Sequence, residues 1–67
     1  MALNQTGLFI VRAWVEAGSS KPLRIHIRQT TDIGVGFQRE ITFADVDAVC
    51  AELQDWLTEV LAANSAA

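Results

Sequence analysis

Hydrophobic and polar positions alternate along the first two thirds of the chain and then change to a helical period. Residues 8–16 are rich in β-branched and aromatic side chains, and residues 23–28 alternate between apolar and basic side chains. Both patterns are typical of strands, and the alternation over 23–31 indicates a half-buried one. A third strand is expected over 37–43, after a turn at 32–36 that holds two glycines.

Each expected strand presents one mainly apolar face. In the third strand Phe37, Ile41 and Phe43 are expected to point inward, and Arg39 interrupts that inner set. Two interpretations are open at this point. Either Arg39 reaches the margin of the sheet with its stem on apolar surface, or a bulge near Gly36 changes the phase of the strand.

The remaining segment, 44–63, has the period of a helix. Thr42 is the expected N-cap, Asp45 and Asp47 lie in the first turns, and Asn64 is expected to end the helix in the left-handed conformation.

At 100° per residue the apolar positions of this helix form one stripe about 140° wide. The stripe holds Val46, Val49, Cys50, Leu53, Trp56, Leu57, Val60 and Leu61. The acidic residues Glu52, Asp55 and Glu59 are expected to face solvent on the opposite or flanking arc.

The order of elements predicts an α+β fold: a three-stranded antiparallel meander, with strands in chain order, packed on one C-terminal helix as a βββα two-layer sandwich. We expect a single domain over 1–67, with a loose N-terminus at 1–7, a sheet over 8–43, a helix over 44–63 and a tail at 64–67. The expected core consists of Phe9, Val11, Val15, Leu23, Ile25, Ile27, Ile41, Phe43, Val46, Val49, Cys50, Leu53, Leu57 and Val60.

The chain is short for an independent fold. Its 67 residues place the core near the lower limit for stability, where a disulfide, a metal or a partner subunit is the usual support. A single cysteine and a single histidine exclude an intrachain disulfide and a closed Cys/His zinc site. We therefore expect no cofactor and a homodimer, with a well-packed monomer as the alternative.

The composition also predicts the cellular compartment of the protein. One cysteine and no basic leader indicate a reducing, cytoplasmic environment. The apolar run at Leu8 is four residues long, which is too short for a membrane span, so no membrane association is expected.

Charge divides the chain into two parts. Residues 1–44 carry five bases and three acids, a net +2, whereas residues 45–67 carry five acids and no base, a net −5. The division separates a basic sheet from an acidic helix, a pattern that favours an interaction module. The total of −3 and the pI of about 4.7 argue against general attraction to nucleic acid.

No constellation of residues indicates catalysis. Cys50 lies in the core stripe of the helix and His26 on the far side of the sheet, so a Cys–His pair is not expected. Gly34 and Gly36 lack the strand-to-helix setting of a phosphate loop. We therefore expect no enzyme activity.

The strand over residues 8–16 is the most hydrophobic one, yet a meander leaves it at an edge. Soluble proteins normally protect such edges with charge, proline or brevity. The expected interface is Leu8, Ile10, Arg12, Trp14 and Glu16. It serves self-association, by antiparallel pairing across a two-fold axis, or an unidentified protein partner. The competing interpretation is that N-terminal residues or another strand order cover this strand.

The outer sheet face has a second interpretation. Arg24, His26 and Arg28 alternate along the second strand and, with Arg12 and Trp14, form a basic face. Three strands and one helix with such a face resemble, as topology, the plant ethylene-response-factor domain and the arm-binding domain of phage tyrosine recombinases. That resemblance implies DNA binding in the major groove through Arg12, Trp14, Arg24 and Arg28. Glu16 and Glu40 depart from it, because they lie beside these residues.

A further resemblance concerns three short segments. Residues 12–16, 23–27 and 55–57 resemble small uncharacterised proteins of high-GC actinobacteria. It implies a bacterial protein and no particular activity.

Overall fold

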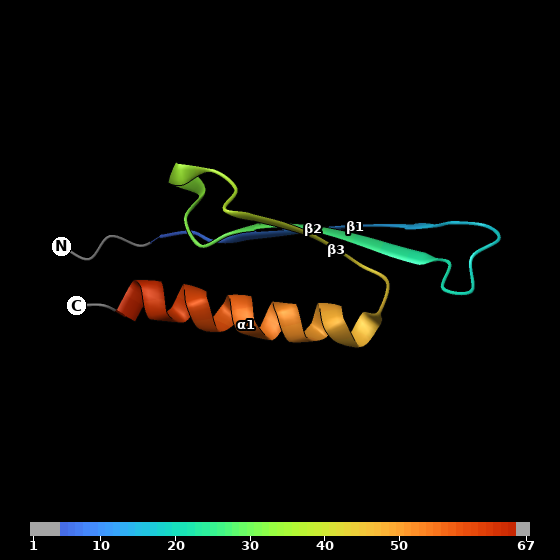
Figure 1. Ribbon diagram of the computed structural model, residues 1–67. Coiled ribbons are helices and arrows are strands. Elements are labelled where there is room, and N and C mark those ends of the chain that lie inside the picture. Colours follow the sequence, from blue (N-terminus) through green and yellow to red (C-terminus); the bar gives the residue numbers. More distant parts are fainter. Residues whose placement is uncertain (1–4, 66–67) are drawn as a thin grey trace.

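The computed structural model describes residues 5–65 and consists of one sheet and one helix in two layers (Figure 1). The elements are β1 (Leu8–Val15), β2 (Leu23–Thr30), a 3₁₀ turn (Ile33–Val35), β3 (Arg39–Phe43) and α1 (Val46–Ser65). The sheet is antiparallel with the order β1-β2-β3. The expected βββα sandwich is confirmed. Residues 1–4 and 66–67 of the expected terminal segments lie outside the described residues.

The register places the odd-numbered residues of all three strands on the face that carries the helix. Val11 pairs with Ile27 across β1 and β2, and Ile27 pairs with Ile41 across β2 and β3. The ring centroids of Phe9 and Trp56 lie 5.1 Å apart, which fixes this face as the one under α1.

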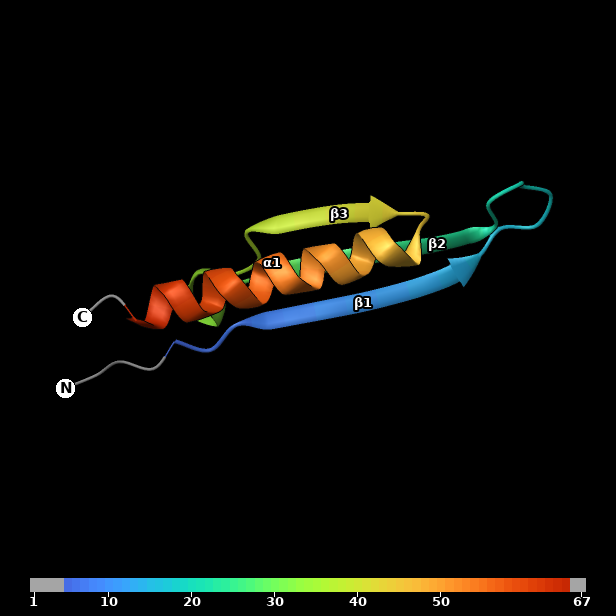
Figure 2. The same cartoon turned by 90° about the horizontal axis from the view of Figure 1, so that it is seen from below.

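The helix runs along the middle of the sheet, between β1 and β3 (Figure 2). A helix with its side chains is about 10–12 Å wide, whereas strands are spaced about 4.8 Å apart. One helix therefore covers β2 well and the two outer strands only partly. Accordingly, Ile25 and Ile27, at 6% and 0% exposure, are the only buried apolar side chains in the described part of the chain.

The expected core is therefore larger than the buried one. Six of its members are half-buried: Phe9, Leu23, Ile41, Phe43, Val49 and Val60. Six others are exposed, contrary to the prediction: Val11, Val15, Val46, Cys50, Leu53 and Leu57. These six lie on β1 and on one side of α1, where no described segment covers them.

The rotation of α1 about its axis explains part of this difference. Glu52, expected in solvent, is buried at 7% exposure against the sheet. Its Oε2 accepts a hydrogen bond from the Gln29 side-chain amide and lies 3.5 Å from Nη1 of Arg39. Turning this carboxylate inward turns the centre of the apolar stripe away from the sheet.

The same contact decides between the two interpretations of Arg39. The pairing of β2 with β3 is continuous from Ile25 opposite Phe43 to Gln29 opposite Arg39, so no bulge interrupts it. Arg39 lies on the helix side and its half-exposed side chain reaches Glu52 at the margin of the sheet.

The third strand begins later than expected, and the side chain of Phe37 therefore lies on the opposite face of the sheet. The strand starts at Arg39 rather than Phe37, after Gly36 turns the chain with a φ of 81°. Phe37 is therefore not an inward residue, because it lies under the guanidinium of Arg28, 4.2 Å from that group, on the outer face.

The start of the helix also differs from expectation. It begins at Val46, and Asp45 rather than Thr42 caps it, because the Asp47 N–H donates to Oδ1 of Asp45 at 3.2 Å.

The expected end of the helix is wrong, and the described residues of the expected loose N-terminus, 5–7, contact other segments. Asn64 is helical, not left-handed, and its Oδ1 accepts from the Gln5 N–H at 2.9 Å. The Thr6 carbonyl accepts from the Ile33 N–H. A Cβ at Gly7 would lie 2.9 Å from Val60. The residues just before β1 are therefore held against α1.

The buried centre of the sheet gives the first prediction. Ile27→Ala should lower the free energy of unfolding by about 2–5 kcal/mol, because it empties a fully buried site. Urea denaturation at one fixed protein concentration measures this loss. The control is Val35→Ala, at a position 67% exposed, which should change stability by less than about 0.5 kcal/mol. Equal losses for both variants would contradict a core centred on β2.

Candidate interaction surface

The free edge of β1 can be described atom by atom from one hydrogen bond. The Glu16 N–H donates to the Pro22 carbonyl at 2.7 Å, one pair beyond the register of β1 with β2. Along an antiparallel strand, the backbone N–H and C=O groups of successive residues point alternately toward the paired strand and away from it, in the plane of the sheet. The even-numbered residues of β1 therefore bond β2, and the odd-numbered ones turn their N–H and C=O groups to the free edge. No described segment pairs with that edge (Figure 2).

This edge lacks the usual protection, whereas the opposite one has it. β1 is eight residues long, contains no proline, and carries one charged residue, Arg12, whose side chain lies on the outer face. β3 is five residues long and begins with Arg39 and Glu40. Short, charged edges resist pairing with another chain and long apolar ones favour it, so β1 is the candidate surface.

The expected interface residues lie together on the outer face of β1. Leu8 and Ile10 are 41% and 40% exposed. The guanidinium of Arg12 lies 5.1 Å from the ring centroid of Trp14, which is half-buried. Leu8 and Ile10 are therefore accessible at one end of β1, whereas the guanidinium of Arg12 covers Trp14 at the other end.

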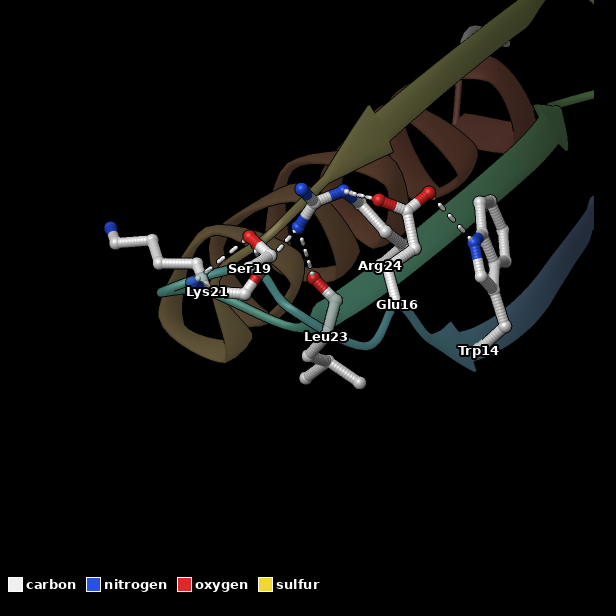
Figure 3. Close-up of polar contacts among 6 residues, drawn as sticks. All are labelled: Trp14, Glu16, Ser19, Lys21, Leu23 and Arg24. Atoms are coloured by element: carbon white, nitrogen blue, oxygen red, sulfur yellow. Dashed lines mark hydrogen bonds and ion pairs between the residues drawn. The ribbon is translucent and has the colours of Figure 1, made fainter.

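Glu16 is held within its own chain (Figure 3). Its two carboxylate oxygens contact the Trp14 indole N–H and Nε of Arg24, each at 3.4 Å. Arg24 also donates to the carbonyls of Lys21 and Leu23. A pairing of Glu16 with Arg12 of a second copy would therefore compete with contacts already present in the chain.

The basic residues of β2 are also held by neighbours. Nε2 of His26 lies 2.8 Å from Oε1 of Glu40. Arg28 covers Phe37 and stands opposite Glu40 in the register. The sheet thus brings Arg24, His26 and Arg28 together on one face, as the sequence predicted, but supplies an acidic or aromatic neighbour to each.

Other candidate sites are weaker. Cys50 is an exposed free thiol on α1, not a buried one as expected, and it lies on the opposite side of the sheet from His26. Among residues 5–65, no cluster of three potential metal ligands occurs, and no helix is long and apolar enough to cross a membrane. A hollow of about 70 Å³ near Leu8 and Phe37 is smaller than the several hundred Å³ of ordinary ligand pockets.

One surface was missed by sequence reasoning. The exposed apolar residues of β1 on the helix side and those on one flank of α1 form what we call the β1–α1 apolar surface. Its members are Val11, Ala13, Val15, Val46, Leu53 and Leu57. The width of the apolar stripe was a usable signal, since about 140° exceeds the roughly 100° that one packed face requires.

Comparison with known proteins adds no relative: no protein-family description, curated protein or solved structure matches this chain. The two resemblances drawn from the sequence therefore stay predictions.

The buried polar contact gives the second prediction. Glu52→Leu should lower the free energy of unfolding by about 1–3 kcal/mol, because the buried Gln29 amide loses its acceptor. The matched control Glu59→Leu removes an exposed carboxylate and should change stability by less than about 0.5 kcal/mol.

Adding Gln29→Leu to Glu52→Leu should recover part of the loss, since both polar partners are then removed together. Thermal or urea unfolding of the three variants measures this coupling. A double variant that is less stable than Glu52→Leu alone would contradict the network.

Proposed function

We propose that this chain is a non-enzymatic interaction module that forms a homodimer through the free edge of β1. The observation that carries the proposal is an eight-residue apolar edge strand whose odd-numbered backbone groups have no partner within the described chain. Pairing two copies would satisfy these groups and join two three-stranded sheets into one of six strands. A two-fold axis perpendicular to the sheet makes the joining strands antiparallel.

The accessible area of the chain supports an interface. A compact monomer of 7.3 kDa should expose about 4,200 Å². The chain exposes 4861 Å², an excess of about 700 Å². A standard interface buries about 800 Å² on each partner. The excess shows that the chain leaves more surface uncovered than a compact domain of its mass.

The shape leads to the same proposal. The radius of gyration is 14.4 Å, against about 11 Å for a compact domain of this length. The Cα atoms extend over 54 × 20 × 11 Å. A thin slab buries few residues, and joining two copies edge to edge would bury more of them.

Nucleic-acid binding is the second candidate, favoured by the three arginines that share the outer face. Arg24 and Arg28 each have an acidic neighbour in the sheet, and Arg12 lies over Trp14. Phosphate contacts that dominate DNA affinity would have to compete with these neighbours.

The exposed free thiol of Cys50 accords with a reducing compartment, so we propose that the module is cytoplasmic.

The dimer gives the third prediction. Wild type should have twice the monomer mass of 7.3 kDa in light scattering at hundreds of micromolar. Val11→Lys should shift it to the monomer mass, because a charge at the centre of an apolar edge opposes pairing. The matched control Val35→Lys, in the 3₁₀ turn, should remain dimeric. A wild type that is monomeric at these concentrations would end the proposal.

The two candidates separate by binding to random duplex DNA at low and moderate salt. Our proposal expects no affinity near the micromolar range. Micromolar binding with a steep salt slope, lost in Arg24→Ala with Arg28→Ala, would favour the nucleic-acid candidate instead.

A further inference from the structure

The β1–α1 apolar surface is larger than the edge of β1 alone. Val11 and Val15 are 52% and 73% exposed, and Val46, Leu53 and Leu57 are 57%, 38% and 51% exposed. Scattered exposed apolar residues are ordinary, but a contiguous group marks an interaction site.

The helix contacts show that the exposed residues of α1 lie on the β1 side of the helix. Trp56 lies against Phe9 of β1, and Glu52 lies beside Arg39 of β3. Turning from Glu52 through Trp56 therefore goes from the β3 side to the β1 side. At 100° per residue, Leu53 and Leu57 lie about 60° and 100° further in that direction. They overhang the side of the sheet where β1 has its free edge.

We propose that this surface is covered by the same surface of a second copy, with the two-fold axis at Val11. The inference rests on the proposed function and deepens it, because it places the apolar centre of the interface on the helix side of β1 rather than on its outer face. The outer-face residues Leu8, Ile10 and Trp14 then form only one side of the contact, and the helix flanks close the other.

The position of the axis follows from the backbone and from charge. Only the odd-numbered residues offer hydrogen bonds at the free edge, so odd residues must pair with odd ones and the axis must lie at a residue. An axis at Arg12 would place the two Arg12 side chains directly opposite each other, which is destabilising. An axis at Ala13 would pair three residues of β1, Leu8, Phe9 and Ile10, with residues 16–18, beyond the end of β1.

An axis at Val11 avoids the opposed arginines and leaves only Val15 opposite a residue outside β1, Gly7. Val11 then meets its own copy, Phe9 pairs with Ala13, and Ile10 on the outer face stands opposite Arg12. Leu8 stands opposite Trp14, an apolar–aromatic pair of the kind that stabilises sheets. No like charges oppose each other, and Glu16 keeps its contacts within its own chain.

The helices then meet above the axis through side chains. Val11 lies two residues beyond Phe9, or about 7 Å along the strand. This distance corresponds to between four and five helical residues from Trp56, so Leu53 lies nearly level with the axis. The two helices would be about three strand spacings, or roughly 14 Å, apart. Helices that pack directly have axes 8–10 Å apart. The Leu53 side chains of the two copies and the valines of β1 would therefore fill the space between the two helices.

The test is a cysteine scan in a Cys50→Ser background. Val11→Cys, Arg12→Cys and Ala13→Cys are oxidised in parallel, with Val35→Cys as the baseline for random collision. Paired residues on the axis have Cα atoms about 5.5 Å apart, within disulfide range. The corresponding distance for Ala13 would be about 14 Å along the strands. Val11→Cys should form covalent dimer at least about tenfold faster than the other three, since pairing raises its effective concentration to millimolar.

A second comparison tests the helix flank. Leu53→Glu should raise the dimer dissociation constant at least about tenfold, because it buries an unpaired charge at the axis. Leu61→Glu, at a position 70% exposed and further from the axis, should change it by less than about threefold. Circular dichroism of each variant verifies the fold.

The outcomes separate this inference from the proposed function. Fastest crosslinking of Arg12→Cys or Ala13→Cys would overturn the axis at Val11 while leaving the edge-paired dimer in place. A dimer mass under reducing conditions with no crosslinking above baseline would overturn the arrangement but not self-association. A monomer mass for the unsubstituted chain would overturn both. Equal effects of Leu53→Glu and Leu61→Glu would exclude the helix flank from the interface.

Discussion

The width of a single helix limits everything else in this fold. A helix can shield a strip of sheet about two strands wide, and the sheet has three strands with β2 beneath the helix. Ile25 and Ile27 of β2 are buried as a result, while Val11 and Val15 of β1 are not. The exposed edge and the slab-like shape follow from this geometric limit, and the rotation of α1 that buries Glu52 leaves the apolar flank of the helix uncovered.

The strand pattern predicted the sheet well because alternation has only two phases. The chain order of the strands and the odd-numbered inner face are as expected. The error lies at Phe37, which falls just before the third strand begins. The position of Gly36, with its positive φ, decides where the pairing starts, and alternation within the strand does not report that.

The helix was predicted less well because an apolar stripe does not specify what covers it. The sequence placed Leu53, Leu57 and Cys50 in the core since they share a stripe with Trp56. The structure centres the helix on Trp56 and Glu52, since Gln29 and Arg39 offer this carboxylate partners at the sheet. A buried carboxylate is stable only when it is hydrogen-bonded or paired. Hydrophobic periodicity counts Glu52 as polar and cannot anticipate those partners.

The candidate site follows the same logic of local pairing. Sequence reasoning correctly brought Arg24, His26 and Arg28 onto one face, because their spacing of two residues is that of a strand. It also expected Glu16 and Glu40 beside them, and the register places Glu40 against His26 and Arg28. Two of the three arginines on this face have acidic neighbours, whereas the β1 edge has backbone groups without a partner in the described chain beside exposed apolar side chains. Of the two surfaces, the edge is the one whose backbone groups have no partner within the described chain, and the proposed second copy would bring the same groups to it in complementary order.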